Sequence, residues 1–140
     1  MSVFVVDASV AAKWFTEEDL AEEALSILDG SHRLHAPDFF FLEIDSIICK
    51  WIRRGIISDS EGDAARKAIR RVPIQTHSFL NLQDSAYHIA VQTRRSVYDC
   101  LYVALAVLVG GRMVTADRRL YKVLAKGPFE DYVAWVEDVR

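Results

Sequence analysis

The sequence contains little of what disulfide-bonded or membrane-spanning proteins are built from. Its 140 residues include only two cysteines, Cys49 and Cys100, too few for a disulfide framework or a cysteine zinc site. Both lie in apolar runs, so we expect buried free thiols of a cytosolic protein. The longest apolar run, residues 100–111, is too short to cross a bilayer, and the first residues lack the basic region of a signal peptide. We therefore expect a cytoplasmic protein without a membrane span.

The sequence also lacks a segment with the composition of a linker, and its net charge is not basic. The chain has six glycines and three prolines, and no stretch is rich in Gly, Pro or Ser, so residues 1–140 are predicted to form a single domain. Its 51% hydrophobic and 26% charged residues exclude intrinsic disorder. A formal net charge of −3 argues against wrapping of nucleic acid by the whole surface, although a local basic rim remains open.

What the sequence does contain is an alternation of short strands with helices. Runs of β-branched and apolar residues predict strands at residues 3–6, 34–36, 74–76, 113–115 and 132–136. Helical patterns predict helices at about residues 8–15, 18–28, 39–53, 58–72, 81–95, 97–109 and 118–124. Gly30 and Gly55 are expected to end two of these helices. Such alternation is typical of an α/β fold, with a parallel sheet covered on both faces.

Two aspartates share one layout, because Asp7 and Asp117 each follow a predicted buried strand and precede a helix. In open α/β sheets, ligand chemistry collects beyond the carboxyl ends of the strands, so the two carboxylates can converge on one crevice. Aspartate is also a favoured N-cap of helices, and both positions fit that role. The sequence leaves both interpretations open.

Two further acids stand beside apolar runs. Asp99 precedes the run from Cys100 to Ala106, although a capping box with Ser96 would also place an acid there. Glu43 lies in a helix whose apolar residues nearly surround it, which is costly for a carboxylate unless it is paired or bound to a metal. The alternative for Glu43 is an edge position with its head in solvent. Asp45 is assigned to a solvated face.

The sharper hypothesis is that Asp7, Glu43, Asp99 and Asp117 meet; we call them the four acids. Four carboxylates in one crevice repel one another, and a hard divalent cation such as Mg²⁺ or Mn²⁺ relieves that repulsion. The histidines are scattered without metal-ligand spacing and are assigned structural or surface roles: His32, His35, His77 and His88. A carboxylate-bound Mg²⁺ favours phosphate-ester chemistry.

Four segments in order carry a resemblance. They are Val5-Val6-Asp7-Ala8-Ser9-Val10 with Lys13-Trp14 and Glu17-Glu18, Ala36-Pro37 leading into the helix with Glu43, Val97 to Ala106 around Asp99, and Val114-Thr115-Ala116-Asp117. With them the chain resembles the PIN-domain ribonucleases, and more closely the VapC-type toxins of bacterial and archaeal toxin–antitoxin pairs, over essentially its whole length. That family often carries Asn where this chain has Ser46.

The resemblance implies a three-layer α/β/α fold with a central, mainly parallel sheet of short strands, in one PIN domain. It also implies Mg²⁺- or Mn²⁺-dependent endonucleolytic cleavage of RNA by a metal-activated water. Asp7 and Asp99 would hold the metal, and Glu43 and Asp117 would hold a second metal or orient the water. Ser9 and Thr115 match small polar positions near that site.

Other function classes remain as alternatives. A related metal nuclease could act on DNA or on structured ends, and an inert interaction module could keep the PIN fold without activity. A phosphoacceptor domain would need a doubly acidic turn after the first strand, and Asp7-Ala8 does not supply one. Nucleotide binding has no support, since the sequence lacks a P-loop and a G-x-G-x-x-G motif.

Although the net charge of the chain is negative, binding of the RNA phosphates requires basic side chains. Lys13 and Arg118 follow Asp7 and Asp117 and are the candidates for contact with the substrate backbone, the alternative being ordinary surface charge. The many helix-borne aromatic residues are assigned mainly to the core, with some available to a partner: Trp14, Phe15, Phe39, Phe40, Phe41 and Trp51. By resemblance, the partners are a second copy of the chain in a homodimer and a VapB-type antitoxin.

Overall fold

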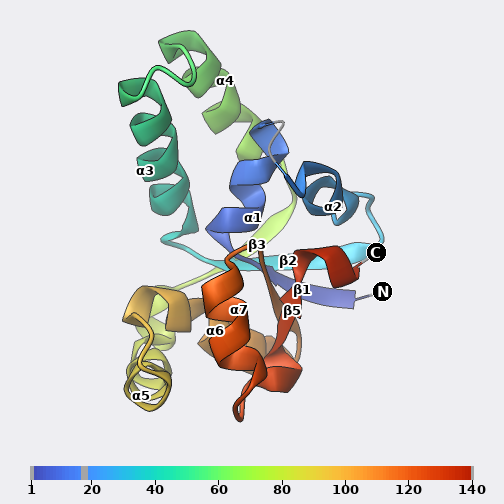
Figure 1. Ribbon diagram of the computed structural model, residues 1–140, viewed down its shortest axis with the longest axis vertical. Helices are drawn as coiled ribbons and strands as arrows, with labels where there is room; N and C mark the ends of the chain where they lie inside the picture. The colour runs from blue at the N-terminus through green and yellow to red at the C-terminus, as the bar shows by residue number, and fades with distance from the viewer. Residues whose placement is uncertain (1, 17–18, 140) are drawn as a thin grey trace.

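The computed structural model describes residues 2–16 and 19–139, and its centre is a five-stranded sheet (Figure 1). The strands are β1 (Ser2–Val6), β2 (His32–Pro37), β3 (Ile74–His77), β4 (Arg112–Thr115) and β5 (Val133–Trp135). Their order across the sheet is β3-β2-β1-β4-β5, and each neighbouring pair is parallel. Parallel sheets need cover on both faces, and the α/β fold predicted from the sequence is confirmed.

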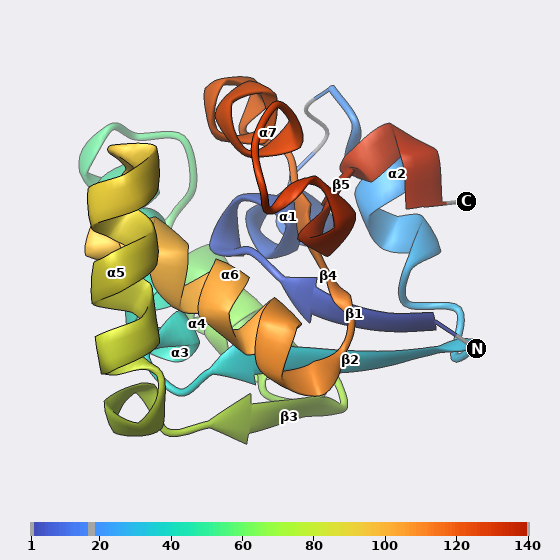
Figure 2. The same ribbon diagram turned by 90° about the horizontal axis from the view of Figure 1, so that it is seen from below.

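Helices form a layer on each side of this sheet. They are α1 (Ala8–Ala12), α2 (Ala21–Ser26), α3 (Phe40–Arg53), α4 (Asp59–Ile69), α5 (Gln83–Thr93), α6 (Val97–Val109) and α7 (Arg118–Ala125), with short 3-10 helices η1 (Lys13–Phe15), η2 (Phe79–Asn81), η3 (Glu130–Tyr132) and η4 (Val136–Val139). Figure 1 shows α1 to α4 on one face of the sheet and α5 to α7 on the other. Figure 2 shows α6 crossing the sheet. The predicted three-layer arrangement is therefore present.

Most element boundaries follow their local sequence signals. Helix α6 has the predicted bounds because the Ser96 side chain caps its start and Gly110, at φ +67°, ends it. Helix α4 starts in the same way, with Ser58 and Glu61 forming a reciprocal capping box. The helix predicted at residues 18–28 is shorter, since α2 ends at Ser26 and not next to Gly30.

Other predictions changed in extent. The segment 8–15 divides into α1 and η1, and only Val133–Trp135 of the segment 132–136 is strand. Gly55 follows α3 at φ +70°, as expected for a residue that ends a helix. Glu17 and Glu18, which contributed to the family resemblance, lie outside the described residues.

The core lies between the sheet and its helices, and α6 supplies much of it. Every residue from Cys100 to Ala106 is buried, which explains why α6 is apolar on nearly all sides. Cys100 is thus the expected buried thiol, but the prediction for Cys49 is wrong because that residue is exposed on α3. The apolar run around Cys49 covers only one face of its helix. Among the described residues, no helix is both long enough and apolar enough for a membrane span.

The helix-borne aromatic residues pack mainly inward. Trp14 and Phe40 are buried, and the remaining four are half-buried against the core: Phe15, Phe39, Phe41 and Trp51. These six residues therefore form no exposed patch of their own. The largest exposed apolar side chains lie at other positions, including Leu42, Tyr87, Tyr98 and Leu108.

Candidate active site at the carboxyl ends of the strands

Asp7 occupies the first position after β1 and is held by two hydroxyl groups. Its Oδ2 accepts hydrogen bonds from Ser9 Oγ at 2.9 Å and from Thr115 Oγ1 at 2.8 Å. Asp7 stands at the N-cap position of α1, yet its side chain forms no capping hydrogen bond, although the Ser9 backbone N–H lies close enough to lower its pKa slightly. Asp7 is therefore the N-cap residue of α1 by position, as the sequence allowed, but its side chain does not cap the helix. Its carboxylate serves a site that includes β4.

The same two hydroxyl groups also bind the backbone between β4 and α7. Ser9 Oγ accepts from the Ala116 N–H at 3.1 Å, and Thr115 Oγ1 accepts from the Asp117 N–H at 3.0 Å. Each hydroxyl thus accepts one backbone proton and donates its own proton to Asp7, which fixes the direction of both hydrogen bonds. The network joins the ends of β1 and β4, which are neighbours in the sheet.

Burial makes the charge on Asp7 costly. Asp7 is only 8% exposed, and burial is the largest cause of its raised pKa. The negative charge of Asp99 raises that pKa further, whereas the hydroxyls of Thr115 and Ser9 lower it. A buried carboxylate that is hydrogen-bonded and also faces another carboxylate is suited to a cationic ligand.

Glu43 comes from the first turn of α3 and points toward α6. Its Oε1 accepts a hydrogen bond of 2.9 Å from the hydroxyl of Tyr102, and the side chain is half-buried, so the interpretation with its head in solvent is wrong. Burial raises the pKa of Glu43 to about 7, the charges of Asp7 and Asp99 add to that rise, and the Tyr102 hydrogen bond opposes it. Burial and the nearby acids also raise the pKa of Tyr102 well above its usual value.

Asp99 lies in the first turn of α6. Its backbone N–H donates to Ser96 Oγ at 3.1 Å, so this part of the capping interpretation is right, and the carboxylate lies 3.9 Å from the Arg95 guanidinium. Burial raises the pKa of Asp99 and the charge of Asp117 adds to this, while Ser96 and Arg95 lower it. The carboxylate therefore has electrostatic contact with the other acids in addition to its place in the cap.

Asp117 is the one acid of the four that caps a helix with its side chain. Its Oδ1 accepts from the Leu120 N–H at 3.1 Å at the start of α7. The residue is exposed, and its charge still reaches Asp99. The N-cap interpretation is right for Asp117 and does not conflict with a place at the rim of the site, because the second carboxylate oxygen is not part of that cap bond.

The four acids share one edge of the sheet and act electrostatically on one another. Asp99 raises the pKa of Asp7, both raise that of Glu43, and Asp117 raises that of Asp99. Within residues 2–16 and 19–139, no three His, Cys, Asp or Glu side chains converge closely enough to enclose a metal ion. A hydrated Mg²⁺ needs only one or two carboxylates and keeps several waters. Among the described residues the four acids therefore do not enclose one ion together, and a hydrated cation held by one or two of them stays a prediction.

The two basic residues proposed for substrate contact differ in their surroundings. Arg118 lies over the Trp135 ring, 4.4 Å from its centroid, and 4.0 Å from Glu137 Oε1. These contacts place its guanidinium beside β5, and the side chain is still 60% exposed. Lys13 is half-buried at the first residue of η1. The role of both residues in substrate binding stays a prediction.

Two residues at the site were not assigned from the sequence. Tyr102 holds Glu43, and Arg95 faces Asp99. A tyrosine inside an apolar helix needs a partner for its hydroxyl when buried, and that signal could have identified Tyr102 as a residue that contacts a polar group. Arg95 lies one turn before Asp99, which is the spacing of an ion pair on a helix.

The remaining predicted polar roles are structural ones. His35 Nδ1 and His77 Nε2 lie 2.9 Å apart and join β2 to β3, while burial and the nearby charges of His77 and Arg33 lower the pKa of His35. Asp45 accepts two hydrogen bonds from Arg66, at 2.6 and 2.9 Å, across α3 and α4. Neither pair includes any of the four acids.

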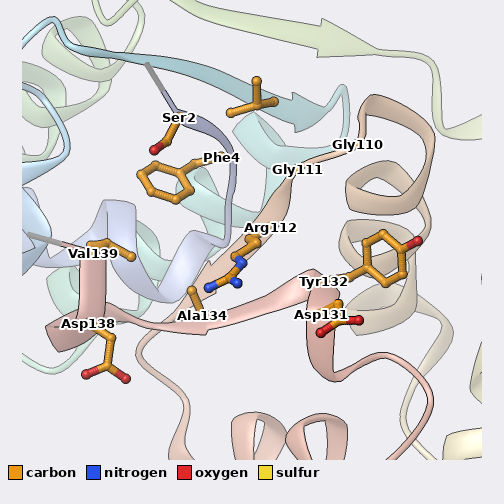
Figure 3. Close-up of a pocket in the computed structure, with 11 residues that line it drawn as sticks. Ser2, Phe4, Gly110, Gly111, Arg112, Asp131, Tyr132, Ala134, Asp138 and Val139 are labelled. Atoms are coloured by element: carbon orange, nitrogen blue, oxygen red, sulfur yellow. The ribbon is translucent and has the colours of Figure 1, made fainter.

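A cavity of about 610 Å³ lies at the amino-terminal ends of β1 and β4, at the other end of the strands from Asp7 and Asp117 (Figure 3). Its lining combines the start of β1 with the segment that enters β4 and with η3 and η4. Arg112, Asp131 and Asp138 are its charged residues. The amino-terminal ends of β1 and β4 line this cavity, whereas Asp7 and Asp117 follow the carboxyl ends of the same two strands, so it is separate from the acid site.

Comparisons with known proteins agree with this geometry. The family model described as PIN domain matches residues 4–126. Ribonuclease VapC3 of Pyrobaculum aerophilum is 30% identical over 118 residues, which are 83% of this chain and 90% of that protein. Ribonuclease VapC9 of Mycobacterium tuberculosis is also 30% identical over 118 residues, 84% of this chain and 88% of the relative.

Two solved structures share the fold. One is VapBC2 from Rickettsia felis bound to a DNA fragment from their promoter, with a TM-score of 0.64, 11% identity, and coverage of 95% of this chain and 98% of that one. The other is a toxin–antitoxin complex from Klebsiella pneumoniae, with a TM-score of 0.65, 14% identity, and coverage of 96% of both chains. At these identities the likeness concerns the fold alone.

Proposed function

The chain belongs to the PIN domain family, and from this premise we propose that it is a metal-dependent endoribonuclease, the toxin of a VapBC-type toxin–antitoxin pair. The observation that carries the proposal is the buried carboxylate of Asp7 at the end of β1, which the hydroxyls of Ser9 and Thr115 hold in place. Relatives named VapC ribonucleases, at 30% identity over most of the chain, support RNA as the substrate.

Asp7 and Asp99 would hold a Mg²⁺ or Mn²⁺ ion, with Glu43 and Asp117 available for a second ion or for the attacking water. When bound, such a cation supplies positive charge to the phosphate oxygens and to the leaving oxygen. Oxygen ligands on a half-buried site match the preference of these ions. Both the choice between Mg²⁺ and Mn²⁺ and the binding of one ion or two are part of the proposal.

The residues of this chain prepare the site for hydrolysis. Ser9 and Thr115 fix the direction of Asp7, and Tyr102 fixes that of Glu43. Glu43, which Tyr102 holds near the other acids, is positioned to orient the attacking water and to accept its proton. The water oxygen bonds to phosphorus, the bond from phosphorus to the leaving oxygen breaks, and that oxygen receives a proton.

The partners of the proposed toxin are a VapB-type antitoxin and a second copy of the chain. The solved structures that share the fold include toxin–antitoxin complexes, which supports an antitoxin partner. We expect a cytoplasmic homodimer. Light scattering at micromolar concentration tests the dimer, and a monomer would refute that part of the proposal.

The activity is tested on protein freed from any bound antitoxin, with single-stranded RNA and with DNA of equal sequence. We expect RNA cleavage that EDTA stops and that Asp99→Asn lowers by roughly two orders of magnitude or more. Asp63→Asn is the matched control, because Asp63 is exposed on α4 and should keep full activity. An undiminished rate in Asp99→Asn would reject the site.

The alternatives have distinct outcomes in the same experiment. Preferential cleavage of DNA or of structured ends would indicate the related nuclease. An absence of cleavage of either polymer, with every divalent cation supplied, would indicate an inert PIN-fold interaction module. The complete set of four acids disfavours that last alternative.

A further inference from the structure

Tyr98 is an exposed aromatic residue beside the acid site. It directly precedes Asp99 on the first turn of α6 and is 64% exposed. A ring that is largely in water contributes little to the core, because hydrophobic stabilisation scales with the apolar area removed from water. Its face is therefore accessible to a ligand that binds at Asp99.

The position of the Tyr98 ring is fixed by neighbouring rings. Its centroid lies 6.1 Å from that of Phe39, at an interplanar angle of 51°. The Phe39 ring lies 5.4 Å from that of Tyr102, whose hydroxyl donates to Glu43. These separations are within the range of favourable aromatic contacts. Three rings therefore extend in contact from the surface to a carboxylate of the site.

Arg95 places a cation one helical turn before Asp99. Its guanidinium lies 3.9 Å from Asp99 Oδ2, and its side chain is 28% exposed. Its Nε is buried and, among the residues that the structure describes, has no hydrogen-bond partner. The exposed part of this guanidinium, and not the buried Nε, is the part that can donate to a phosphate oxygen.

We propose that Tyr98 and Arg95 form a subsite for one unpaired nucleotide of the RNA substrate. The base stacks on the Tyr98 ring, and a neighbouring phosphate binds the Arg95 guanidinium. This inference rests on the proposed function and adds to it the two residues that hold one base and one phosphate. In a duplex both faces of a base are covered by its neighbours, so only an unpaired base can lie on the ring. Stacking tolerates every base, so the subsite selects single strands and not a sequence.

The test uses a five-nucleotide oligoadenylate that carries one 2-aminopurine, whose fluorescence falls when it stacks. The protein is Asp7→Asn, or the wild type with EDTA, so that the RNA stays intact. Tyr98→Ala should remove the quenching and weaken binding roughly 5- to 150-fold, the range for loss of one stacked base. Tyr98→Phe should keep both signals, because the ring face and not the hydroxyl makes the contact.

Tyr87→Ala is the matched control. Tyr87 is 59% exposed and lies on α5, so its removal deletes an equally exposed ring outside the subsite. Arg95→Gln should weaken binding, reduce the slope of log K against log salt by about 0.7, and leave the quenching at saturation unchanged. A hairpin that carries the 2-aminopurine inside a long stem closed by G·C pairs should show no further quenching with any variant.

The subsite would be overturned if Tyr98→Ala bound the RNA and quenched 2-aminopurine as strongly as the protein without that change. It would also be overturned if Tyr87→Ala lost as much affinity and quenching as Tyr98→Ala. If the wild type cleaves RNA while Tyr98→Ala binds like its parent, only this inference fails. If the parent binds no RNA and the wild type cleaves none, the proposed function fails with it. Thermal unfolding of each variant verifies that an exposed ring was removed without loss of the fold.

Discussion

Thr115 Oγ1 donates a hydrogen bond of 2.8 Å to Asp7 Oδ2 and joins residues that are 108 positions apart in the sequence. Thr115 is fully buried, and its hydroxyl also accepts the Asp117 N–H. One side chain thus sets the direction of a proposed metal ligand and the start of the turn that carries another acid. This relationship explains why the side chain of Asp7 does not bond to the first turn of α1, although Asp7 is the N-cap residue of that helix.

Thr115→Val should lower both stability and RNA cleavage. Valine has nearly the same shape but leaves the Asp117 N–H without its acceptor and Asp7 without one donor, and an unsatisfied buried group costs about 1–3 kcal/mol. Urea unfolding measures the free energy and the RNA assay measures the rate. Thr115→Ser should restore most of both, because it keeps the hydroxyl.

Thr76→Val is the control for this change. Thr76 is exposed on the edge strand β3, so the same substitution there removes no buried hydrogen bond. A loss of stability as large in Thr76→Val as in Thr115→Val would show that the effect comes from the residue type and not from the contact with Asp7.

Local signals in the sequence predicted most of the fold. Helix α6 was predicted with its bounds because the Ser96 cap and Gly110 lie next to the apolar run that they delimit. The exposure of Cys49 was missed since an apolar run does not state which side of a helix faces the core. The length of α2 was overestimated because its end depends on packing more than on the glycine that follows.

The sequence proposed which acids form the candidate site but did not predict their contacts. The residue types indicated four acids, yet the sequence alone left Asp7 and Asp117 equivalent, each as a cap or a site residue. Only the fold separates them, because the donors to Asp7 include Thr115 from a distant strand whereas Asp117 binds the N–H of Leu120 nearby. Tyr102 was missed for the same reason, since its partner lies on another helix.

Divalent cations should stabilise the folded chain. An ion that binds only the folded state at 100 times its Kd adds about 2.7 kcal/mol to the free energy of unfolding. We therefore expect Mg²⁺ or Mn²⁺ to raise the midpoint of thermal unfolding, and EDTA to reverse this. Asp99→Asn should abolish the rise whereas Asp63→Asn should keep it. An equal rise in both variants would locate the ion away from the acid site.

The contribution of Glu43 to stability without metal should fall as the pH rises from about 4.5 to about 7, whereas the lowered pKa of His35 acts in the opposite direction. Folding raises the pKa of Glu43 from 4.5 to about 7, so the folded state binds a proton more tightly than the unfolded state across that window. Glu43 therefore contributes stability that is fully present below pH 4.5 and is lost as the pH passes 7. The raised pKa values of Asp7 and Asp99 act in the same direction.

Glu43→Gln isolates the contribution of Glu43 to this pH dependence. The amide can still accept the Tyr102 hydrogen bond but has no charge to desolvate, so the variant should be more stable than the wild type at pH 7.5 and similar to it at pH 4.5. Urea unfolding at both pH values in EDTA measures the difference. If Glu43→Gln lost the same free energy of unfolding at pH 4.5 and at pH 7.5, Glu43 would not be the source of the pH dependence.

Gly111→Ala should destabilise the junction of β1 and β4, on which the spacing of Asp7 and Thr115 depends. A Cβ at Gly111 would lie 2.5 Å from the Val3 carbonyl oxygen and 2.9 Å from Val3 Cγ1. Since backbone cannot yield as a flexible side chain does, we expect a loss of about 1–3 kcal/mol in the free energy of unfolding. Gly127→Ala is the control, because a Cβ there meets nothing within 4 Å and Gly127 has no left-handed backbone. If Gly111→Ala unfolded at the same denaturant midpoint as Gly127→Ala, the close approach of the two strands would be contradicted. If Gly111→Ala still folds, its cleavage rate should fall as well, because β4 carries Thr115 toward Asp7.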